Sequence, residues 1–109
     1  HAILKGFWEI RLFGVDSIFN HLKICNYKLN VGTSGGKVID FICEKNGNKV
    51  YIQAAYLMPD DRIIQREYGN LLEIDDNYRK LVVSLDKYAP KNIKGIEHIL
   101  LKDFLTDFR

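Results

Sequence analysis

The chain has 109 residues, 47% of them hydrophobic and 28% charged, which is enough for one domain with a single hydrophobic core. The formal net charge of +2, from 16 basic and 14 acidic residues, is too balanced for a dedicated nucleic-acid-binding domain with a strongly basic face. No apolar run approaches the roughly 20 residues of a membrane span, and no secretory signal peptide is evident, so no membrane partner is expected.

The N-terminal stretch HAILKGFWEIRLFG, residues 1–14, has no clean hydrophobic period. Since the chain begins at His1, we expect a piece of a longer protein or a tag remnant. Residues 1–14 are then an arm or linker from a missing preceding domain, and residues 15–109 form the folded domain. A 3.6-residue stripe predicts a helix over 15–25, with Asp16 near its start as an N-cap. The stripe consists of Val15, Ile18, Phe19, Leu22 and Cys25.

Three strands are expected after this helix. Residues 27–33 read as the first strand and TSGG as a turn. Residues 37–45 and 48–57 read as two further strands joined by Asn46–Gly47, which is the strongest short hairpin signal. Pro59 ends the third strand.

The second half alternates helix and strand. Residues 60–74 predict an amphipathic helix with Ile64, Tyr68, Leu71 and Leu72 inward. Residues 81–86 and 96–101 are short apolar strands, residues 89–95 a loop, and residues 102–109 a terminal helical turn. The expected order is α-β-β-β-α-β-β-α, in one α/β (α+β) domain with a central mixed sheet and helices on both faces.

The run GTSGGK, Gly32 to Lys37, resembles a phosphate-binding loop only superficially. Val31 stands where that signature needs its first glycine, and Val38 where it needs a hydroxyl. A strand follows, not the helix whose N-terminus would hold phosphate. A hairpin turn is the better interpretation, so no nucleotide site is expected in these residues.

The Asn46–Gly47 turn sets a register that places Asp40 opposite Gln53 and Val38 opposite Ala55. Side chains alternate between the two faces of a strand. One face is therefore expected to carry Asp40, Ile42, Tyr51, Gln53 and Ala55. The other is expected to be an apolar core face of Ile39, Phe41, Cys43, Val50, Ile52 and Ala54.

The segments VIDF and YIQAAY have the layout of the restriction-endonuclease-like nucleases, the PD-(D/E)xK superfamily. Together with IFNHLKICNYKLNVGT, REYGNLLEIDDNY and GIEHILLKDFL, they resemble the C-terminal domain of a family of uncharacterised prokaryotic AAA+ ATPases. The similarity covers about residues 15–108. It implies a restriction-endonuclease-like fold attached to an N-terminal ATPase domain of the same chain, which would bind ATP and Mg²⁺ itself.

The resemblance also implies roles for individual residues. Asp40 matches the strand aspartate and Gln53 the second acid that hold a divalent metal in such nucleases. Ala55 matches the lysine that activates water, and Asp16 falls near the helix glutamate but is one methylene shorter. Mg²⁺ is held chiefly by carboxylates, and Ala55 cannot stabilise a developing charge. The site is therefore interpreted as degenerate, with no catalytic residue and no cofactor in these residues.

Three interpretations of Asp40 and Gln53 stay open: a hydrogen-bonded cross-strand pair, which is favoured, a weak metal site at Asp40, and an active nuclease. Tyr51, Arg62 and Arg66 are further candidate ligand-binding residues, although Arg66–Glu67 is also expected to form a structural ion pair or a cap contact. No serine or cysteine is spaced for an evident catalytic triad. The thiols of Cys25 and Cys43 are expected to be buried and reduced in a cytoplasmic protein.

The favoured function is that of a non-catalytic, nuclease-like accessory domain that docks against the ATPase or holds a protein partner. The alternative is a domain that binds DNA in a degenerate nuclease groove. A true divalent-metal nuclease is the third hypothesis. Self-association into a homo-oligomer stays open.

Overall fold

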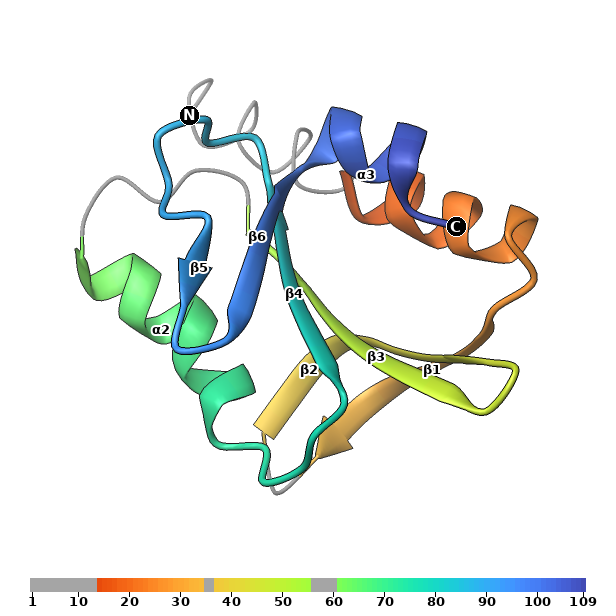
Figure 1. Ribbon diagram of the computed structural model, residues 1–109, viewed down its shortest axis with the longest axis horizontal. Coiled ribbons are helices and arrows are strands. Elements are labelled where there is room, and N and C mark those ends of the chain that lie inside the picture. Colours follow the sequence, from red (N-terminus) through yellow and green to blue (C-terminus); the bar gives the residue numbers. More distant parts are fainter. Residues whose placement is uncertain (1–13, 35–36, 56–60) are drawn as a thin grey trace, which may run out of the picture.

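The computed structural model describes residues 14–34, 37–55 and 61–109 (Figure 1). They form a mixed six-stranded sheet in the order β1-β2-β3-β4-β6-β5. The strands are β1 (Lys28–Ser34), β2 (Lys37–Lys45), β3 (Asn48–Ala54), β4 (Arg79–Ser84), β5 (Asn92–Ile93) and β6 (Ile96–Leu100). The first three are antiparallel neighbours, β4 and β6 run parallel to β3, and β5 is antiparallel to β6.

Helices cover both faces of this sheet, as expected (Figure 1). A first helix spans residues 14–24 and lies beside α3 (Leu101–Asp107) on one face. The other face is covered by α2 (Asp61–Leu72), which connects the parallel strands β3 and β4. Within the described residues no helix has the length and apolar character needed to cross a membrane.

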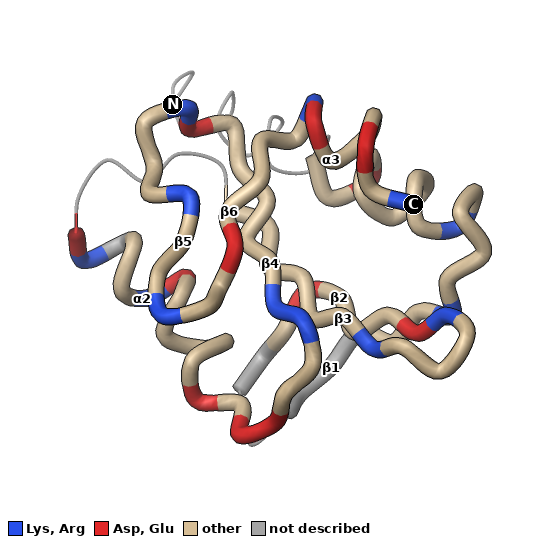
Figure 2. The backbone as a smooth tube through the Cα atoms, in the orientation of Figure 1, with Lys and Arg blue, Asp and Glu red and all other residues tan. Residues whose placement is uncertain are grey.

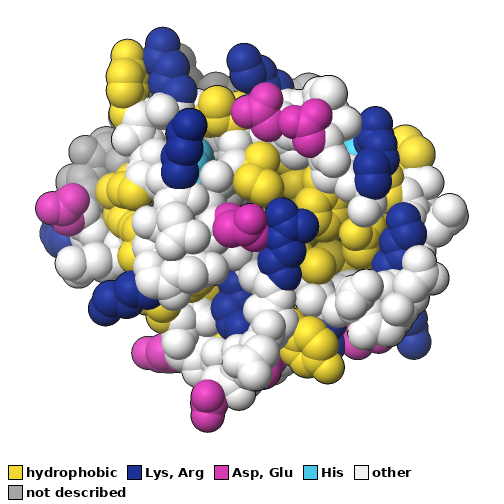
Figure 3. All heavy atoms as spheres, viewed as in Figure 1, with side chains coloured by type: hydrophobic (Ala, Val, Ile, Leu, Met, Phe, Trp, Pro, Cys, Tyr) yellow, Lys and Arg dark blue, Asp and Glu magenta, His cyan; other side chains and the backbone are white. Residues whose placement is uncertain are grey.

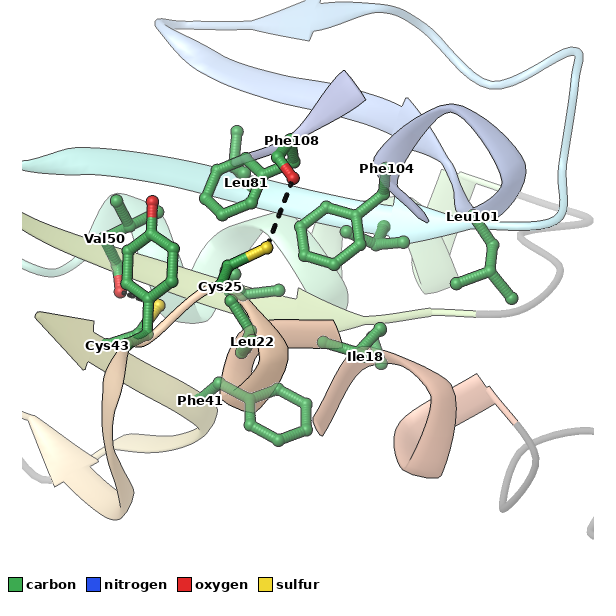
Figure 4. Close-up of a cluster of buried hydrophobic side chains, with 14 residues drawn as sticks. Ile18, Leu22, Cys25, Phe41, Cys43, Val50, Leu81, Leu101, Phe104 and Phe108 are labelled. Atoms are coloured by element: carbon green, nitrogen blue, oxygen red, sulfur yellow. Dashed lines mark hydrogen bonds between the residues drawn. The ribbon is translucent and has the colours of Figure 1, made fainter. Parts of the chain in front are cut away.

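The core under the first helix and α3 is the larger of two buried clusters (Figure 4). Side chains from both helices meet alternate residues of β2, β3 and β4 there. Phe104 and Phe108 stack with ring centroids 4.7 Å apart, and Phe108 stacks on Tyr27 at 5.5 Å. This cluster contains Ile18, Leu22, Cys25, Tyr27, Phe41, Cys43, Val50, Ile52, Ala54, Leu81, Val83, Leu101, Phe104 and Phe108.

The second cluster lies between α2 and the opposite face of the sheet. Tyr68 and Leu71 are its inward helix residues, as the stripe on α2 predicts, and both are fully buried. Ile64 packs against the cluster from the edge. Leu72, also expected inward, is 40% exposed, because it lies beyond the narrow stripe at the end of the helix.

The expected order of the elements needs correction. The order is α-β-β-β-α-β-β-β-α, because the expected loop 89–95 contains β5. Lys94 and Gly95 have φ angles of 50° and 90°, so they form a second tight hairpin that pairs Ile93 with Ile96. A two-residue strand with lysine at the first turn position carries no sequence signal.

The first helix also differs from expectation. Its described part begins at Gly14, so the exposed Asp16 lies inside the helix and is not its N-cap. Phe19, expected on the buried stripe, is 41% exposed, and Lys23 lies over its ring at 5.8 Å. The proposed arm, residues 1–14, lies outside the described residues except for Gly14.

Candidate functional site

The β2–β3 hairpin has the predicted turn and the predicted register near that turn. Asn46 and Gly47 have φ angles of 54° and 81°, as the two central residues of a type I′ turn require. The pairing runs from Lys45 with Asn48 to Phe41 with Ile52. Ile42, Tyr51 and Ala55 face the α2 side of the sheet, as expected.

The predicted alternation fails at Asp40, where β2 contains a β-bulge. Asn30 pairs with Ile42 and Gly32 pairs with Ile39, so a step of two residues along β1 is matched by a step of three residues along β2. As a result Ile39 belongs to the α2-side cluster, while Phe41 belongs to the cluster on the other face. The expectation that Ile39 shares a face with Phe41 is therefore wrong, because one extra residue reverses the alternation.

The bulge brings Asp40 and Gln53 together through their backbones and side chains. The Gln53 side-chain oxygen Oε1 accepts a hydrogen bond from the Asp40 N–H at 3.2 Å. The Asp40 carboxylate oxygen Oδ2 accepts one from the Ala54 N–H at 2.8 Å. The carboxylate thus takes the place of a ladder carbonyl, and the pair closes the end of the β2–β3 ladder.

The donor set at this position does not fit a Mg²⁺ site. Asp40 supplies the one carboxylate, and one of its oxygens is bound by the Ala54 N–H. The Gln53 side chain is 8% exposed, and Ala55, at the lysine position, is 3% exposed and carries no functional group. No three acidic, histidine or cysteine side chains gather into a metal-binding group anywhere in the described residues.

Three polar residues, Gln53, Ser84 and His98, lie on the α2 side of the sheet and are called the polar row here. Gln53 on β3 lies level with Val82 on β4, and Val82 lies level with His98 on β6. Strands lie about 4.8 Å apart, so the Cα atoms of Gln53 and His98 are about 10 Å apart. Ser84, two residues after Val82, extends the same polar row toward the carboxyl ends of the strands.

Ser84 and His98 form a buried pair that the sequence analysis does not predict. Ser84 Oγ and His98 Nε2 are 2.5 Å apart, and the side chains are 2% and 9% exposed. Ser84 Oγ also accepts the Asp86 N–H at 3.0 Å. The sequence shows a serine and a histidine within two short strands, but the pairing of these two residues depends on the strand order.

Burial lowers the pKa of His98 below its usual value, and the nearby Asp86 carboxylate partly offsets that shift. The imidazole is therefore neutral at neutral pH. The arrangement is not a catalytic triad, because the Ser84 hydroxyl is buried and no hydrogen bond joins Asp86 to the His98 ring among the described contacts. Ser84 acts here as a partner that orients the imidazole.

Tyr51, at the middle of β3, belongs to a separate polar cluster. Its hydroxyl donates to Asp76 Oδ2 at 2.7 Å, and Lys80 Nζ donates to Asp76 Oδ1 at 2.9 Å. Burial raises the pKa of Asp76, but hydrogen bonds from Lys80, Tyr51 and the Tyr78 N–H outweigh it, so the pKa lies below its usual value. Tyr51 is 3% exposed, so its ring cannot stack on a base.

The other candidate residues do not join the Asp40–Gln53 pair. Asp16 is exposed on the first helix, whose buried residues face the cluster on the other side of the sheet. Arg62 and Arg66 are exposed on α2. Arg66 Nη2 lies 3.3 Å from Glu67 Oε1, so the predicted Arg66–Glu67 ion pair is confirmed.

The two cysteines are buried free thiols, as predicted. Cys43 donates to the Val50 carbonyl at 3.2 Å, and burial raises the pKa of its thiol to about 12 (Figure 4). Cys25 Sγ lies 3.6 Å from His21 Nε2, but that nitrogen also lies 2.6 Å from the Phe108 carbonyl. A carbonyl only accepts, so His21 donates there and acts as a structural tie to the C-terminal segment.

Comparison with known proteins gives one relative of substantial similarity. An uncharacterized protein of Haemophilus influenzae (strain ATCC 51907 / DSM 11121 / KW20 / Rd) is 36% identical to this chain over 88 residues. The match covers 81% of this chain and 21% of that protein, so the chain spans about a fifth of the length of its relative. No family model matches the chain.

Proposed function

We propose that this chain is a non-catalytic, nuclease-like accessory domain of an AAA+ ATPase, which docks against the ATPase domain or holds a protein partner. One observation carries the non-catalytic part. The side chains of Asp40 and Gln53 each bind the neighbouring strand. Gln53 Oε1 accepts the Asp40 N–H, and Asp40 Oδ2 accepts the Ala54 N–H. These side chains stabilise the sheet at the position where a nuclease would hold its metal.

The missing lysine supports the same conclusion. A phosphodiester transition state needs preorganised positive charge beside the attacked phosphorus. Ala55 packs in the α2-side cluster and offers no charge. Replacing it with lysine would place a long side chain at a site that is 3% exposed, so a single substitution does not restore the chemistry.

The length of the relative fits a domain within a larger protein. Most of the Haemophilus protein lies outside the matched 21%. In our proposal an ATPase domain that binds ATP and Mg²⁺ occupies part of that remainder. The coding region upstream of His1 offers a direct check, because a Gly-x-x-x-x-Gly-Lys-Ser/Thr loop belongs there. An upstream region without that loop contradicts the ATPase assignment.

The surface charge favours a protein partner over DNA. Basic and acidic residues are both spread over the described part of the trace in Figure 2, and they are interspersed on the face drawn in Figure 3. DNA affinity depends on several cations meeting successive phosphates. A face of mixed sign offers no such row.

One observation favours DNA binding as the second candidate. Tyr78 is 47% exposed and Lys49 Nζ lies 5.4 Å from the centre of its ring, so an aromatic platform beside a cation is available at the surface. A single platform binds weakly. We therefore keep DNA binding as the alternative outcome of the following test.

Fluorescence anisotropy with labelled duplex, single-stranded and branched DNA tests the function. The titrations are run at low and at physiological salt with Mn²⁺ present, and the DNA is then checked on a gel. We expect neither binding nor cleavage. Salt-sensitive binding without cleavage would favour the second candidate. Metal-dependent cleavage that Asp40→Asn abolishes would overturn the proposal.

Docking needs its own measurement. The ATPase portion of the parent protein, produced separately, is titrated into the fluorescently labelled 109-residue chain. We expect a saturable rise in anisotropy. If the two parts do not associate, docking on the ATPase is ruled out, and the proposal then depends on a separate protein partner.

A further inference from the structure

A small pocket lies at the carboxyl ends of β4 and β6, apart from the Asp40–Gln53 pair. Its volume is about 250 Å³. The pocket is formed by the loop after β4, by the end of β6 and by the first turn of α3. The lining residues are Lys87, Ala89, Lys91, His98, Ile99, Leu100 and Asp103.

Ser84 determines which nitrogen of His98 carries the proton. A serine hydroxyl has one hydrogen to donate and two lone pairs to accept with. Ser84 Oγ accepts the Asp86 N–H, and among its contacts in the described structure the acceptor within reach of the hydroxyl hydrogen is His98 Nε2, at 2.5 Å. The neutral imidazole therefore accepts at Nε2 and carries its proton on Nδ1.

The Nδ1–H group keeps some contact with solvent. Nδ1 has no hydrogen-bond partner among the described residues, whereas every buried side-chain nitrogen or oxygen in that part of the chain has one. Nδ1 is therefore not fully buried. His98 also lines the pocket, so this nitrogen is a hydrogen-bond donor of the pocket lining that no described residue uses.

Two lysines add positive charge around that donor. Within the described structure neither Lys87 nor Lys91 forms an ion pair, and the recorded contact of the Lys87 ammonium is with the Tyr88 ring at 5.2 Å. The Lys91 carbonyl accepts the His98 N–H at 2.9 Å, so the backbone that carries Lys91 is held against β6. Three residues with nitrogen donors, Lys87, Lys91 and His98, thus line one small pocket.

We propose that this pocket binds a phosphate group, either free inorganic phosphate or the phosphoryl group of a small phosphomonoester. A phosphate group is small enough for the pocket, carries about one and a half to two negative charges at neutral pH, and accepts several hydrogen bonds at once. Two ammonium groups and one oriented N–H complement that charge and geometry. The proposal is independent of the proposed function.

Two carboxylates near the pocket repel a bound anion, so removing one of them should change the phosphate affinity in a known direction. Asp103 lines the pocket, and Asp86 lies close enough to His98 to act on its pKa. The Asp86 Oδ1 accepts the Tyr88 N–H at 3.0 Å and is outside the lining. Removing the Asp103 charge should therefore strengthen phosphate binding.

The test titrates inorganic phosphate, and separately phenyl phosphate, into the ¹⁵N-labelled chain at constant ionic strength, with chloride and acetate as reference ions. We expect saturable shifts of the His98 side-chain and the Lys91 backbone signals with either phosphate. Tighter binding of phenyl phosphate identifies a phosphomonoester as the natural class, and equal or weaker binding identifies free phosphate.

Surface variants keep the test independent of folding. Each lysine supplies a charge-assisted hydrogen bond, so the double variant Lys87→Gln/Lys91→Gln should weaken binding by about tenfold or more. Asp103→Asn should strengthen it. The matched control Lys23→Gln/Lys28→Gln removes the same charge from exposed positions on the first helix and β1. Equal weakening in both double variants, or shifts that acetate reproduces, would overturn the site.

Discussion

The carboxylate of Asp40 on β2 accepts a hydrogen bond from the N–H of Ala54 on β3 at 2.8 Å. A side chain that the superfamily resemblance assigns to metal binding thus replaces a backbone carbonyl in the ladder. The replacement is possible because the β-bulge next to Asp40 turns its side chain into the plane of the sheet. A stability role for Asp40 follows, and it can be measured without knowing any ligand.

Asp40→Ala should lower the free energy of unfolding by about 1–3 kcal/mol, since it removes the acceptor of the Ala54 N–H in a residue that is 1% exposed. Asp40→Asn keeps a side chain of the same length with one acceptor oxygen, so it should lower the free energy of unfolding clearly less than Asp40→Ala does. Urea unfolding of the three proteins gives both values. If Asp40→Ala is as stable as the parent chain, the carboxylate is free for another role and the structural interpretation fails.

Gly47→Val should destabilise the β2–β3 hairpin by roughly 1–2 kcal/mol, because Gly47 has a φ of 81° that a β-branched residue resists. Open space surrounds Gly47, so the backbone alone causes the loss. Gly69→Ala is the matched control. It lies inside α2 with open space around it, and it should stabilise the protein by up to about 1 kcal/mol. An unchanged melting temperature in Gly47→Val would contradict the turn.

The hairpin and the bulge show what local sequence does and does not determine. Asn46–Gly47 is sufficient for the turn because the required φ angles are a property of those two residues. The β-bulge depends on how β1 packs against β2, and nothing in the alternation around Asp40 signals an extra residue. The face assignments are therefore right for Phe41, Ile42 and Cys43 and wrong for Ile39.

The polar row was missed for a related reason. Ser84 and His98 are separated by 14 residues and meet because β4 and β6 are parallel neighbours. Spacing in sequence says nothing about such a pair until the strand order is known. Phe19 was misplaced because a helical stripe indicates a face but not its width, which depends on how closely the neighbouring α3 approaches.

Stability should fall as the pH drops below about 6.5, because burial lowers the pKa of His98 in the folded protein. Between the usual pKa of about 6.5 and the lowered value, the unfolded chain binds a proton that the folded protein does not. Above that range His98 contributes no pH dependence. Urea unfolding at a series of pH values should show this slope, and His98→Gln should flatten it. The comparison is between the pH dependence of the free energy of unfolding in the variant and in the parent chain, and not between their absolute stabilities. An equal slope in parent and variant would assign the effect to another group.

Cys43 should resist thiol reagents in the folded protein. Its side chain is 0% exposed and burial raises its pKa to about 12, so the reactive thiolate is negligible at neutral pH. Cys25→Ser leaves Cys43 as the one thiol in the chain. Its reaction with a disulfide reagent should be slow in buffer and fast in guanidinium chloride. Fast labelling without denaturant would show that the β2–β3 face of the core opens readily.

Phe108 should be a main contributor to the stability of the first helix and α3. It is 6% exposed, stacks on Phe104 and Tyr27, and its carbonyl accepts a hydrogen bond from His21 at 2.6 Å. Phe108→Ala should therefore cost about 3 kcal/mol, at the low end of the range for such truncations because the chain near Arg109 has room to relax.

Tyr88→Ala is the control for that loss, since it truncates an aromatic side chain that is 85% exposed and should change stability by less than about 0.5 kcal/mol. Hydrogen exchange then locates the effect. In Phe108→Ala the amides of the first helix should exchange faster relative to those of α2, because α2 packs on the other face of the sheet. Equal acceleration in both helices would mean that Phe108 stabilises the domain as one cooperative unit.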